Sequence, residues 1–276
     1  ILNSTTDEDY DAFASGTMGS FEFIYRKIQK LELTPAMLAL DPCSGSIVVT
    51  DTETGQVRAM AIYPSYDNNK LTNVIDSDYY DKITSDKTTP MYNRATMQRT
   101  APGSTYKMLV SAAGLGEGVI DVGSVITDYG TFTKISPSPK CWLTGGHGAL
   151  GLAEAIEVSC NGFFYEVGYR LATDSNGVYQ DAQGIDKLQK YATLFGLNRK
   201  SGVEIEEIDP HISDSDAVRS AIGQGTNNYT PVQLSRYVTA IANEGKCYDL
   251  TLVNEIKNVE GRTVYKNDNV PESTID

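Results

Sequence analysis

The sequence predicts an α/β domain of the α+β kind, with a largely antiparallel sheet and a mostly helical middle. Three observations support this class. A strand–turn–strand pattern comes early, at residues 44–64. Helical patterns interrupted by glycines follow residue 104, and a second strand pair is expected at residues 252–266. No internal repeat is present, and 276 residues allow one large domain or two small ones.

The N-terminal segment divides into an arm and a helix. Residues 1–17 are polar and acidic, which is typical of a linker or a loosely held arm. The apolar residues that follow recur at helical spacing: Phe21, Ile24, Ile28 and Leu31. They predict an amphipathic helix over residues 21–33, and Pro35 just beyond it is a stop signal.

The early strand pattern predicts a hairpin. Ile47, Val48 and Val49 form a short strand, Thr54-Gly55 turns the chain, and residues 57–63 form the second strand. Pro64 ends that strand. Residues 65–93 are polar with no clear period, so we expect a long loop there.

The middle of the chain is expected to be helical. Helical patterns occupy residues 108–115, 152–158, 163–171 and 185–195. The last of these ends at Gly196, as a helix C-cap does. Thr230 and Pro231 predict the start of a helix at 232–242, because threonine caps helices and proline suits the first helical position. Glu260-Gly261 is the expected turn of the late hairpin.

Composition limits the function classes. The net charge is −13 and the pI about 4.6, so the surface should repel nucleic acid and anionic membranes. No apolar run approaches the roughly 18–20 residues of a membrane span. The four cysteines, Cys43, Cys141, Cys160 and Cys247, include no C-x-x-C pair. Cys141 with His147 lacks closely spaced partners, so we expect no zinc site and no other cofactor.

Ser104 and Lys107 are candidate catalytic residues. They lie three positions apart, and such residues share one face of a helix, so the lysine amine can reach the serine hydroxyl. A serine needs a base to become a nucleophile, and a lysine serves as that base only when burial or a nearby cation lowers its pKa. Taken alone, the pattern equally describes a helix capped by serine.

A second group of polar residues strengthens the catalytic interpretation. Ser159, 55 residues after Ser104, and Asn161 follow a predicted helix. A second hydroxyl can relay a proton between the lysine and the leaving group, and an asparagine can hydrogen-bond a substrate amide and the lysine. This is the Ser-Lys chemistry of serine acyl transferases, which join S-x-x-K to S-x-N and K-[TS]-G.

At these motifs the chain resembles the transpeptidase domain of class B penicillin-binding proteins. The matching segments cover roughly residues 44–265 and include "NRATMQRTAPGSTYKMLVSAAGLGEGVI", "GLAEAIEVSCNGFFYEVGYRL" and "AIGQGTNNYTPVQLSRYVTAIANEGK". The resemblance implies a β-lactamase/transpeptidase-like fold, with an antiparallel central sheet flanked by a mostly helical subdomain. It also implies that Ser104 is the acylated nucleophile, Lys107 its base, and Ser159 and Asn161 the second, substrate-binding motif. Cys160 between them is expected to be a small buried residue.

The resemblance implies a peptidoglycan D,D-transpeptidase at the extracytoplasmic face of a bacterial membrane, with its anchor outside this chain. Its substrate would be the D-Ala-D-Ala end of a stem peptide, and β-lactams would acylate it. A glycosyltransferase of the elongation or division machinery is an expected partner. Residues 1–40 would be an arm and helix left from a linker or pedestal, and residues 41–276 the penicillin-binding domain.

The sequence leaves open where the third motif of the family, K-[TS]-G, lies. Lys200-Ser201-Gly202 matches it by composition, but it lies only 39 residues after Asn161 and directly after a predicted helix. We interpret it as a structural turn. No later K-[TS]-G occurs, so the last strands of the sheet are expected to be missing from this chain. A second polypeptide that completes the sheet, a truncation and a divergent member are the alternatives, and the isolated chain is expected to be inactive.

Other functions remain open. A β-lactamase or carboxypeptidase on the same fold, and a silent penicillin-binding sensor or scaffold, would carry the same motifs. A Ser-His-Asp triad using His147 is a further alternative, but Lys107 already offers a base and no G-x-S-x-G elbow occurs. We therefore expect His147 to be a loop residue near the mouth of the site.

Overall fold

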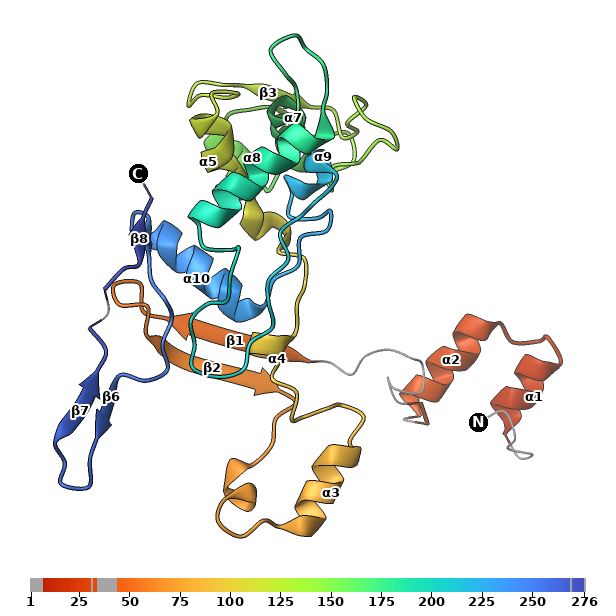
Figure 1. Cartoon of the computed structure of the whole chain (residues 1–276). Coiled ribbons are helices and arrows are strands. Elements are labelled where there is room, and N and C mark those ends of the chain that lie inside the picture. The colour runs from red at the N-terminus through yellow and green to blue at the C-terminus, as the bar shows by residue number, and fades with distance from the viewer. Residues whose placement is uncertain (1–6, 31, 34–43, 269, 276) are drawn as a thin grey trace. The chain divides into compact units, whose positions relative to one another are not determined.

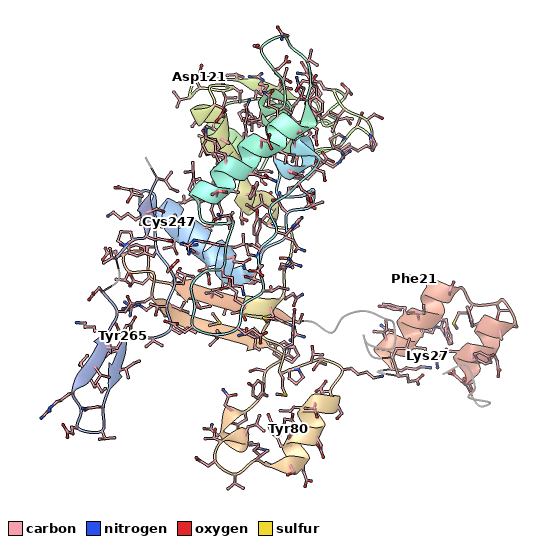
Figure 2. All side chains as sticks on the ribbon, in the orientation of Figure 1. Phe21, Lys27, Tyr80, Asp121, Cys247 and Tyr265 are labelled. Carbon is pink, nitrogen blue, oxygen red and sulfur yellow. The ribbon has the colours of Figure 1, made fainter. Side chains whose placement is uncertain are left out.

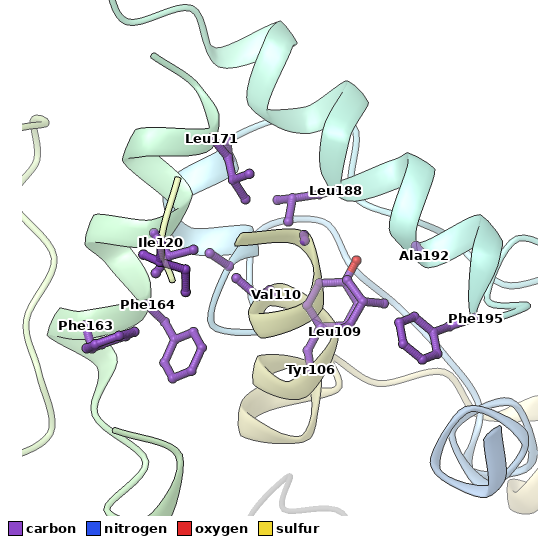
Figure 3. Close-up of a cluster of buried hydrophobic side chains, with 14 of the residues drawn as sticks. Tyr106, Leu109, Val110, Ile120, Phe163, Phe164, Leu171, Leu188, Ala192 and Phe195 are labelled. Atoms are coloured by element: carbon purple, nitrogen blue, oxygen red, sulfur yellow. The ribbon is translucent and has the colours of Figure 1, made fainter. Parts of the chain in front are cut away.

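Helix α5 (Lys107–Gly116) lies at the centre of the main hydrophobic core. It packs against α7 (Asn161–Leu171) and α8 (Asp181–Leu194), and α9 (Ala217–Ser220) packs on both of these. Leu109 and Val110 of α5 are fully buried, and Figure 3 shows them between the side chains of α7 and α8. Each large side chain buried in this way contributes about 1.5–3 kcal/mol. The core therefore fixes the first turn of α5, which carries Lys107.

The structure is a computed structural model that describes residues 7–30, 32–33, 44–268 and 270–275. Two compact units can be distinguished. The smaller one comprises residues 1–45 and 63–92, and the larger one comprises residues 46–62 and 93–276. All the residues of the site described below belong to the larger unit.

The early hairpin is present as expected. Strand β1 (Gly45–Thr50) pairs with β2 (Val57–Tyr63), and α10 (Pro231–Ala242) lies beside them in Figure 1. Val48 packs with Val232 of α10, and Thr50 Oγ1 lies 2.6 Å from Thr239 Oγ1. Thr230 caps α10 and forms a capping box with Gln233, as the sequence indicates.

The α/β class is confirmed, but the strands form separate pairs. Among the described residues there are four two-stranded sheets, and the three pairs whose register is known are antiparallel. Apart from β1–β2, these pairs are β3 (Ile126–Asp128) with β4 (Gly148–Leu150), β5 (Lys246–Cys247) with β8 (Ser273–Thr274), and β6 (Glu255–Lys257) with β7 (Thr263–Lys266). The predicted late hairpin is the β6–β7 pair, which carries Tyr265 (Figures 1 and 2).

Two segments expected to be irregular contain helices. Helix α1 (Glu8–Ala14) lies in the expected arm, where the Asp7 carboxylate caps it and Phe13 stacks on Phe23. The expected loop at 65–93 contains a 3₁₀ turn, η2 (Asn68–Leu71), and helix α3 (Ser77–Ser85). Ile83 is the buried residue of α3, so its sequence shows no apolar stripe.

Helix α2 (Ser20–Gln29) exists where the sequence predicts it, but it buries a different face. Phe23 and Lys27 are buried, whereas Phe21, Ile24 and Ile28 are exposed (Figure 2). The Lys27 ammonium is paired with the carboxylates of Asp7 and Glu32, which makes burial of this charge tolerable. Leu31 and Pro35 lie outside the described residues.

The remaining helices are short. They are α4 (Arg94–Met97), the 3₁₀ turn η3 (Gly103–Tyr106) and α6 (Leu152–Glu157). Within the described part of the chain, no helix combines the length and apolar character needed to cross a membrane.

Candidate active site

Ser104 sits on a sharp turn that enters α5. Pro102 precedes the turn, and Gly103 adopts a left-handed backbone with φ +58°. Residues 103–106 form the single 3₁₀ turn η3, which continues directly into α5 at Lys107. Ser104 is exposed while Lys107 behind it is buried, so the turn presents a hydroxyl to solvent above a hidden amine.

Lys107 is held by three oxygen atoms. Its side chain is buried, and the Nζ atom donates to the Ser159 carbonyl at 2.8 Å, to Ser159 Oγ at 3.0 Å and to Asn161 Oδ1 at 2.8 Å. The ring of Phe164 lies 5.5 Å from the same nitrogen. Three acceptors match the three donors of an ammonium group. The structure thus brings Lys107 together with both residues of the predicted second motif.

Ser159 stands between the lysine and the nucleophile. Its Oγ lies 2.7 Å from Ser104 Oγ and donates to it. The sequence predicts a direct contact between Lys107 and Ser104, but among the described residues the hydrogen bonds run from Lys107 to Ser159 and from Ser159 to Ser104. The reason is the left-handed backbone of Ser159, with φ +52°, between α6 and α7. This conformation directs the hydroxyl toward η3.

Burial makes Lys107 more available as a proton acceptor near neutral pH than a free lysine. Removing the ammonium from water lowers the pKa of Lys107 to about 8, because the buried charge loses hydration. A neutral amine keeps two N–H donors and gains a lone pair. It can then keep the Ser159 carbonyl and Asn161 as acceptors while accepting a proton from Ser159 Oγ. The direction of both hydroxyl bonds is reversed in that state, and Ser104 becomes the donor.

The turn bearing Ser104 rests on Gly223. The amide of Gly103 donates to the Gly223 carbonyl at 3.0 Å, and Gly223 has φ +73°. A Cβ atom at position 223 would lie 2.0 Å from the Gly103 carbonyl oxygen. The segment Ile222–Gly225 therefore lies directly against the turn that bears Ser104.

We expect Gly223→Ala to lower the rate of Ser104 acylation by about a hundredfold, since a misplacement near 1 Å can have that effect. The added methyl group displaces the Gly103 backbone and so the Ser104 hydroxyl. Labelling by a fluorescent β-lactam, followed over time, measures the rate. Gly118→Ala is the matched control, because Gly118 also has a positive φ, +67°, but has open space around it. Equal rates in both variants would contradict the argument.

Four side chains near the site could hold a metal ion. The ligand atoms of Asp128, Cys141, His147 and Cys160 all lie within 4.8 Å of one another. His147 Nδ1 is 3.0 Å from Asp128 Oδ2 and 3.5 Å from Cys141 Sγ, and Cys160 Sγ is 3.3 Å from Asp128 Oδ2. Neighbouring ligands around a tetrahedral zinc ion are about 3.3–3.8 Å apart. We name these residues the Asp128 cluster.

Two groups of the Asp128 cluster, the Asp128 carboxyl and the Cys160 thiol, have shifted pKa values. Burial opposes ionisation of Asp128, but hydrogen bonds from His147, the Gly130 amide and the two thiols lower its pKa to about 2. Burial raises the pKa of Cys160 to about 12, and its thiol donates to Asp128. Cys160 is buried as expected, but it also belongs to the cluster. Cys43 lies outside the described residues.

His147 forms its hydrogen bonds within the Asp128 cluster and not with the candidate nucleophile Ser104. Its ring and its backbone amide both contact the Asp128 carboxylate. No hydrogen bond joins it to Ser104 in the described ranges. The Ser-His-Asp alternative therefore finds no support in the geometry.

Lys200-Ser201-Gly202 lies in a different environment. Ser201 is fully buried, and its amide and hydroxyl both donate to the carboxylate of Glu207. Gly202 packs closely on Asp249. These contacts give the tripeptide a structural role and leave its serine no access to a ligand.

Sequence reasoning missed the Asp128 cluster. Cys141 and His147 are six residues apart, but Asp128 and Cys160 come from a strand and a helix N-terminus on either side of them. The β3–β4 pair brings these segments together, and three-residue strands leave too weak a pattern to be predicted. The spacing of Asp128, Cys141, His147 and Cys160 along the sequence matches no metal-site motif that could have replaced this signal.

A family model described as the penicillin binding protein transpeptidase domain matches residues 45–276. The chain is 31% identical over 224 residues to the peptidoglycan D,D-transpeptidase MrdA of Haemophilus influenzae. That match covers 75% of this chain and 33% of the relative, so the chain spans about a third of its length.

Solved structures are similar in fold. Pseudomonas aeruginosa PBP2 in complex with WCK 5153 superimposes with a TM-score of 0.71 at 27% identity, over 84% of this chain and 53% of that one. A peptidoglycan synthase complex that coordinates polymerization and crosslinking contains a chain with a TM-score of 0.72 at 27% identity, over 84% of this chain and 39% of that one.

Proposed function

The chain belongs to the penicillin-binding protein transpeptidase domain family, and on this premise we propose that it is the catalytic domain of a peptidoglycan D,D-transpeptidase. Within it, residues 41–276 are the penicillin-binding domain and residues 1–40 precede it as an arm. The relative from Haemophilus influenzae carries that activity in its name. The hydrogen-bonded sequence Lys107–Ser159–Ser104 is the observation that carries the proposal, because it connects a nucleophile to a base of lowered pKa.

The first half-reaction acylates Ser104. The Ser104 oxygen attacks the carbonyl between the two D-Ala residues, its proton passes to Ser159 Oγ, and the proton of Ser159 passes to Lys107. When the tetrahedral intermediate collapses, the carbon–nitrogen bond breaks and D-Ala leaves as an amine that takes up the proton. Asn161 holds Lys107 and offers its amide to the substrate.

The second half-reaction reverses these transfers. An amine from a neighbouring stem peptide attacks the ester, gives its proton to the Ser159–Lys107 pair and releases Ser104. A β-lactam enters the first step in place of the D-Ala-D-Ala end, but its leaving group stays attached after the ring opens. The ester then persists, which is why β-lactams should label Ser104.

Labelling with fluorescent penicillin tests the proposal. We expect one label per full-length protein, and peptide mass mapping should place it on Ser104. Rapid nitrocefin turnover would favour a hydrolase of the same fold instead. Absence of any label, with retained binding to a polymerase, would favour a silent scaffold.

The β1–β2 sheet supports a further segment in the site, because within the described residues it has only two strands and its outer face is uncovered. Ile47 and Val49 are 58% and 44% exposed, on the face of the strand that does not pack on α10. A two-stranded sheet is marginal without more strands. We propose that a polypeptide segment carrying a Lys-Thr/Ser-Gly motif pairs with this sheet and binds the substrate carboxylate. Labelling of a sample that contains residues 1–276 alone would refute this.

Membership of the family also suggests a partner protein and a cellular location for this chain. The similar synthase complex couples polymerization to crosslinking. We therefore propose a glycosyltransferase partner and a position at the extracytoplasmic face of the membrane, where stem peptides are found. Pull-down of a polymerase by the full-length protein, lost when the domain is removed, would support the partner.

We also propose that the Asp128 cluster binds one zinc ion as a structural site. Two thiolates, an imidazole and a carboxylate are ligands that zinc prefers, and a closed set of four leaves no open position for catalysis. Asp128 ends β3 and His147 immediately precedes β4, so they flank the β3–β4 loop, and Cys160 lies between Ser159 and Asn161. The ion would thereby tie this loop to the second motif.

Metal removal provides the test. We expect about one zinc per chain by elemental analysis, and a chelator should lower the melting temperature by several degrees. Cys160→Ser should lose most of the metal. Cys247→Ser is the control, because Cys247 is also buried but lies on β5 outside the cluster (Figure 2). Equal zinc content in the two variants would refute the site.

A further inference from the structure

Trp142 is the one tryptophan of the chain, and this residue is 61% exposed. It lies beside Ser159, which contacts the candidate nucleophile Ser104. Its indole Nε1 donates to the Ser159 carbonyl at 3.1 Å and to the Val158 carbonyl at 3.2 Å. An exposed tryptophan usually finds a more buried position. Here the indole N–H contacts two backbone carbonyls, and the ring contacts the His147 ring.

The Ser159 carbonyl receives two donors. Lys107 Nζ lies at 2.8 Å and Trp142 Nε1 at 3.1 Å, and a carbonyl oxygen has two lone pairs. Both are therefore used, which fixes the orientation of the peptide group after Ser159. The two carbonyls that Trp142 contacts belong to Val158, the C-cap of α6, and to Ser159 directly after it, where backbone carbonyls have no intrahelical partner.

Ser159 needs this support because its backbone is strained. It has φ +52°, a region that favours glycine and costs other residues of order 1–3 kcal/mol. The amides of Ser159 and Cys160 bond back to α6 at Ile156 and Ala155, and Lys107 occupies one lone pair of the Ser159 carbonyl. The Trp142 N–H occupies the other lone pair and adds a further constraint on this peptide group.

The Trp142 ring packs on a side chain that is itself held in place. Its ring meets the His147 ring edge-on, with centroids 5.0 Å apart and an interplanar angle of 66°. His147 is held in turn by Asp128 through both its ring and its amide. The indole N–H is therefore presented to Ser159 by a fixed support.

We infer that Trp142 is a positioning residue: its N–H holds the Ser159 carbonyl and so keeps the Ser159 hydroxyl between Lys107 and Ser104. This rests on the proposed acylation of Ser104. Loss of the N–H leaves the carbonyl to one donor, Lys107, and widens the range of orientations that the Ser159 peptide adopts. The proton path from Ser104 is then aligned for a smaller fraction of the time.

The test removes the N–H without changing the ring. In the full-length protein, 3-benzothienylalanine at position 142 replaces the N–H by sulfur, and 5-fluorotryptophan at 142 is the matched control that retains it. We expect the acylation rate constant for a β-lactam to fall about tenfold with benzothienylalanine, equivalent to about 1.4 kcal/mol, within the range for a hydrogen bond. The dissociation constant of the non-covalent complex should change less than about threefold, and the melting temperature should be unchanged.

Further measurements separate the possible failures. Tyr129→Ala removes another exposed aromatic ring and should leave the rate unchanged. Equal acylation rate constants for the two tryptophan analogues would overturn the inference while leaving the proposed function intact. The indole N–H signal of ¹⁵N-labelled protein gives a readout that needs no acylation. It should exchange with water far more slowly than free tryptophan, and rapid exchange would overturn the inference even if penicillin labels nothing.

Discussion

Ser104→Ala is expected to reduce penicillin labelling of the full-length protein to background. The Ser104 hydroxyl is the atom that forms the ester, and no second hydroxyl can replace it, because Ser159 Oγ lies 2.7 Å behind it in contact with Lys107. The change removes one exposed oxygen atom from the surface, so the melting temperature should stay within a few degrees. Gel fluorescence and intact mass after penicillin treatment measure the loss.

Thr105→Ala is the matched control for this substitution. Thr105 is the adjacent hydroxyl on the same turn, but its Oγ1 donates to the Pro102 carbonyl at 2.8 Å and takes no part in the path from Lys107. We expect it to retain labelling. Normal labelling of the Ser104 variant would refute the assignment of the nucleophile. Loss in both variants would show that the turn, rather than one oxygen, had been disrupted.

The sequence predicts the helices of the site better than the contacts between them. The start of α5 and the cap of α10 follow from local signals, such as proline before a turn and threonine before a helix. The site also depends on the left-handed backbone of Ser159, a conformation that no local sequence signal predicts. A non-glycine residue rarely adopts this conformation, so the sequence does not predict that Ser159 stands between Lys107 and Ser104. It predicts a direct Lys107–Ser104 contact instead.

The other misses share a physical cause. α2 buries Lys27 because two carboxylates neutralise it, whereas a periodicity argument assigns buried positions to apolar residues such as Phe21. The Asp128 cluster is assembled by three-residue strands whose pairing is tertiary. In both cases polar partners distant in sequence decide the outcome, and a single sequence does not reveal which ones meet.

Lys107→Arg should lower the rate of Ser104 acylation by about 10²–10⁴-fold, the usual contribution of a general base. Arginine keeps the positive charge and can donate to the Ser159 and Asn161 oxygens, but it stays protonated at every accessible pH. The substitution therefore separates a proton acceptor from a fixed charge. Stopped-flow acylation by a chromogenic β-lactam measures it, and Lys190→Arg, on the exposed surface of α8, is the control. A loss below about threefold would mean that charge alone is required.

The pH dependence of the wild-type protein gives the same base an independent signature. Burial lowers the pKa of Lys107 to about 8, so at pH 7 about a tenth of the molecules carry the neutral amine. Because only the neutral form accepts a proton, the acylation rate should rise about ninefold from pH 6 to 7 and about fivefold from pH 7 to 8, and then level off. The arginine variant should lack this rise, since its side chain does not titrate in the range. A flat wild-type profile would show that Lys107 is already neutral at pH 6 or that it is not the base. Retention of the rise in the Lys107→Arg protein would assign the titration to another group.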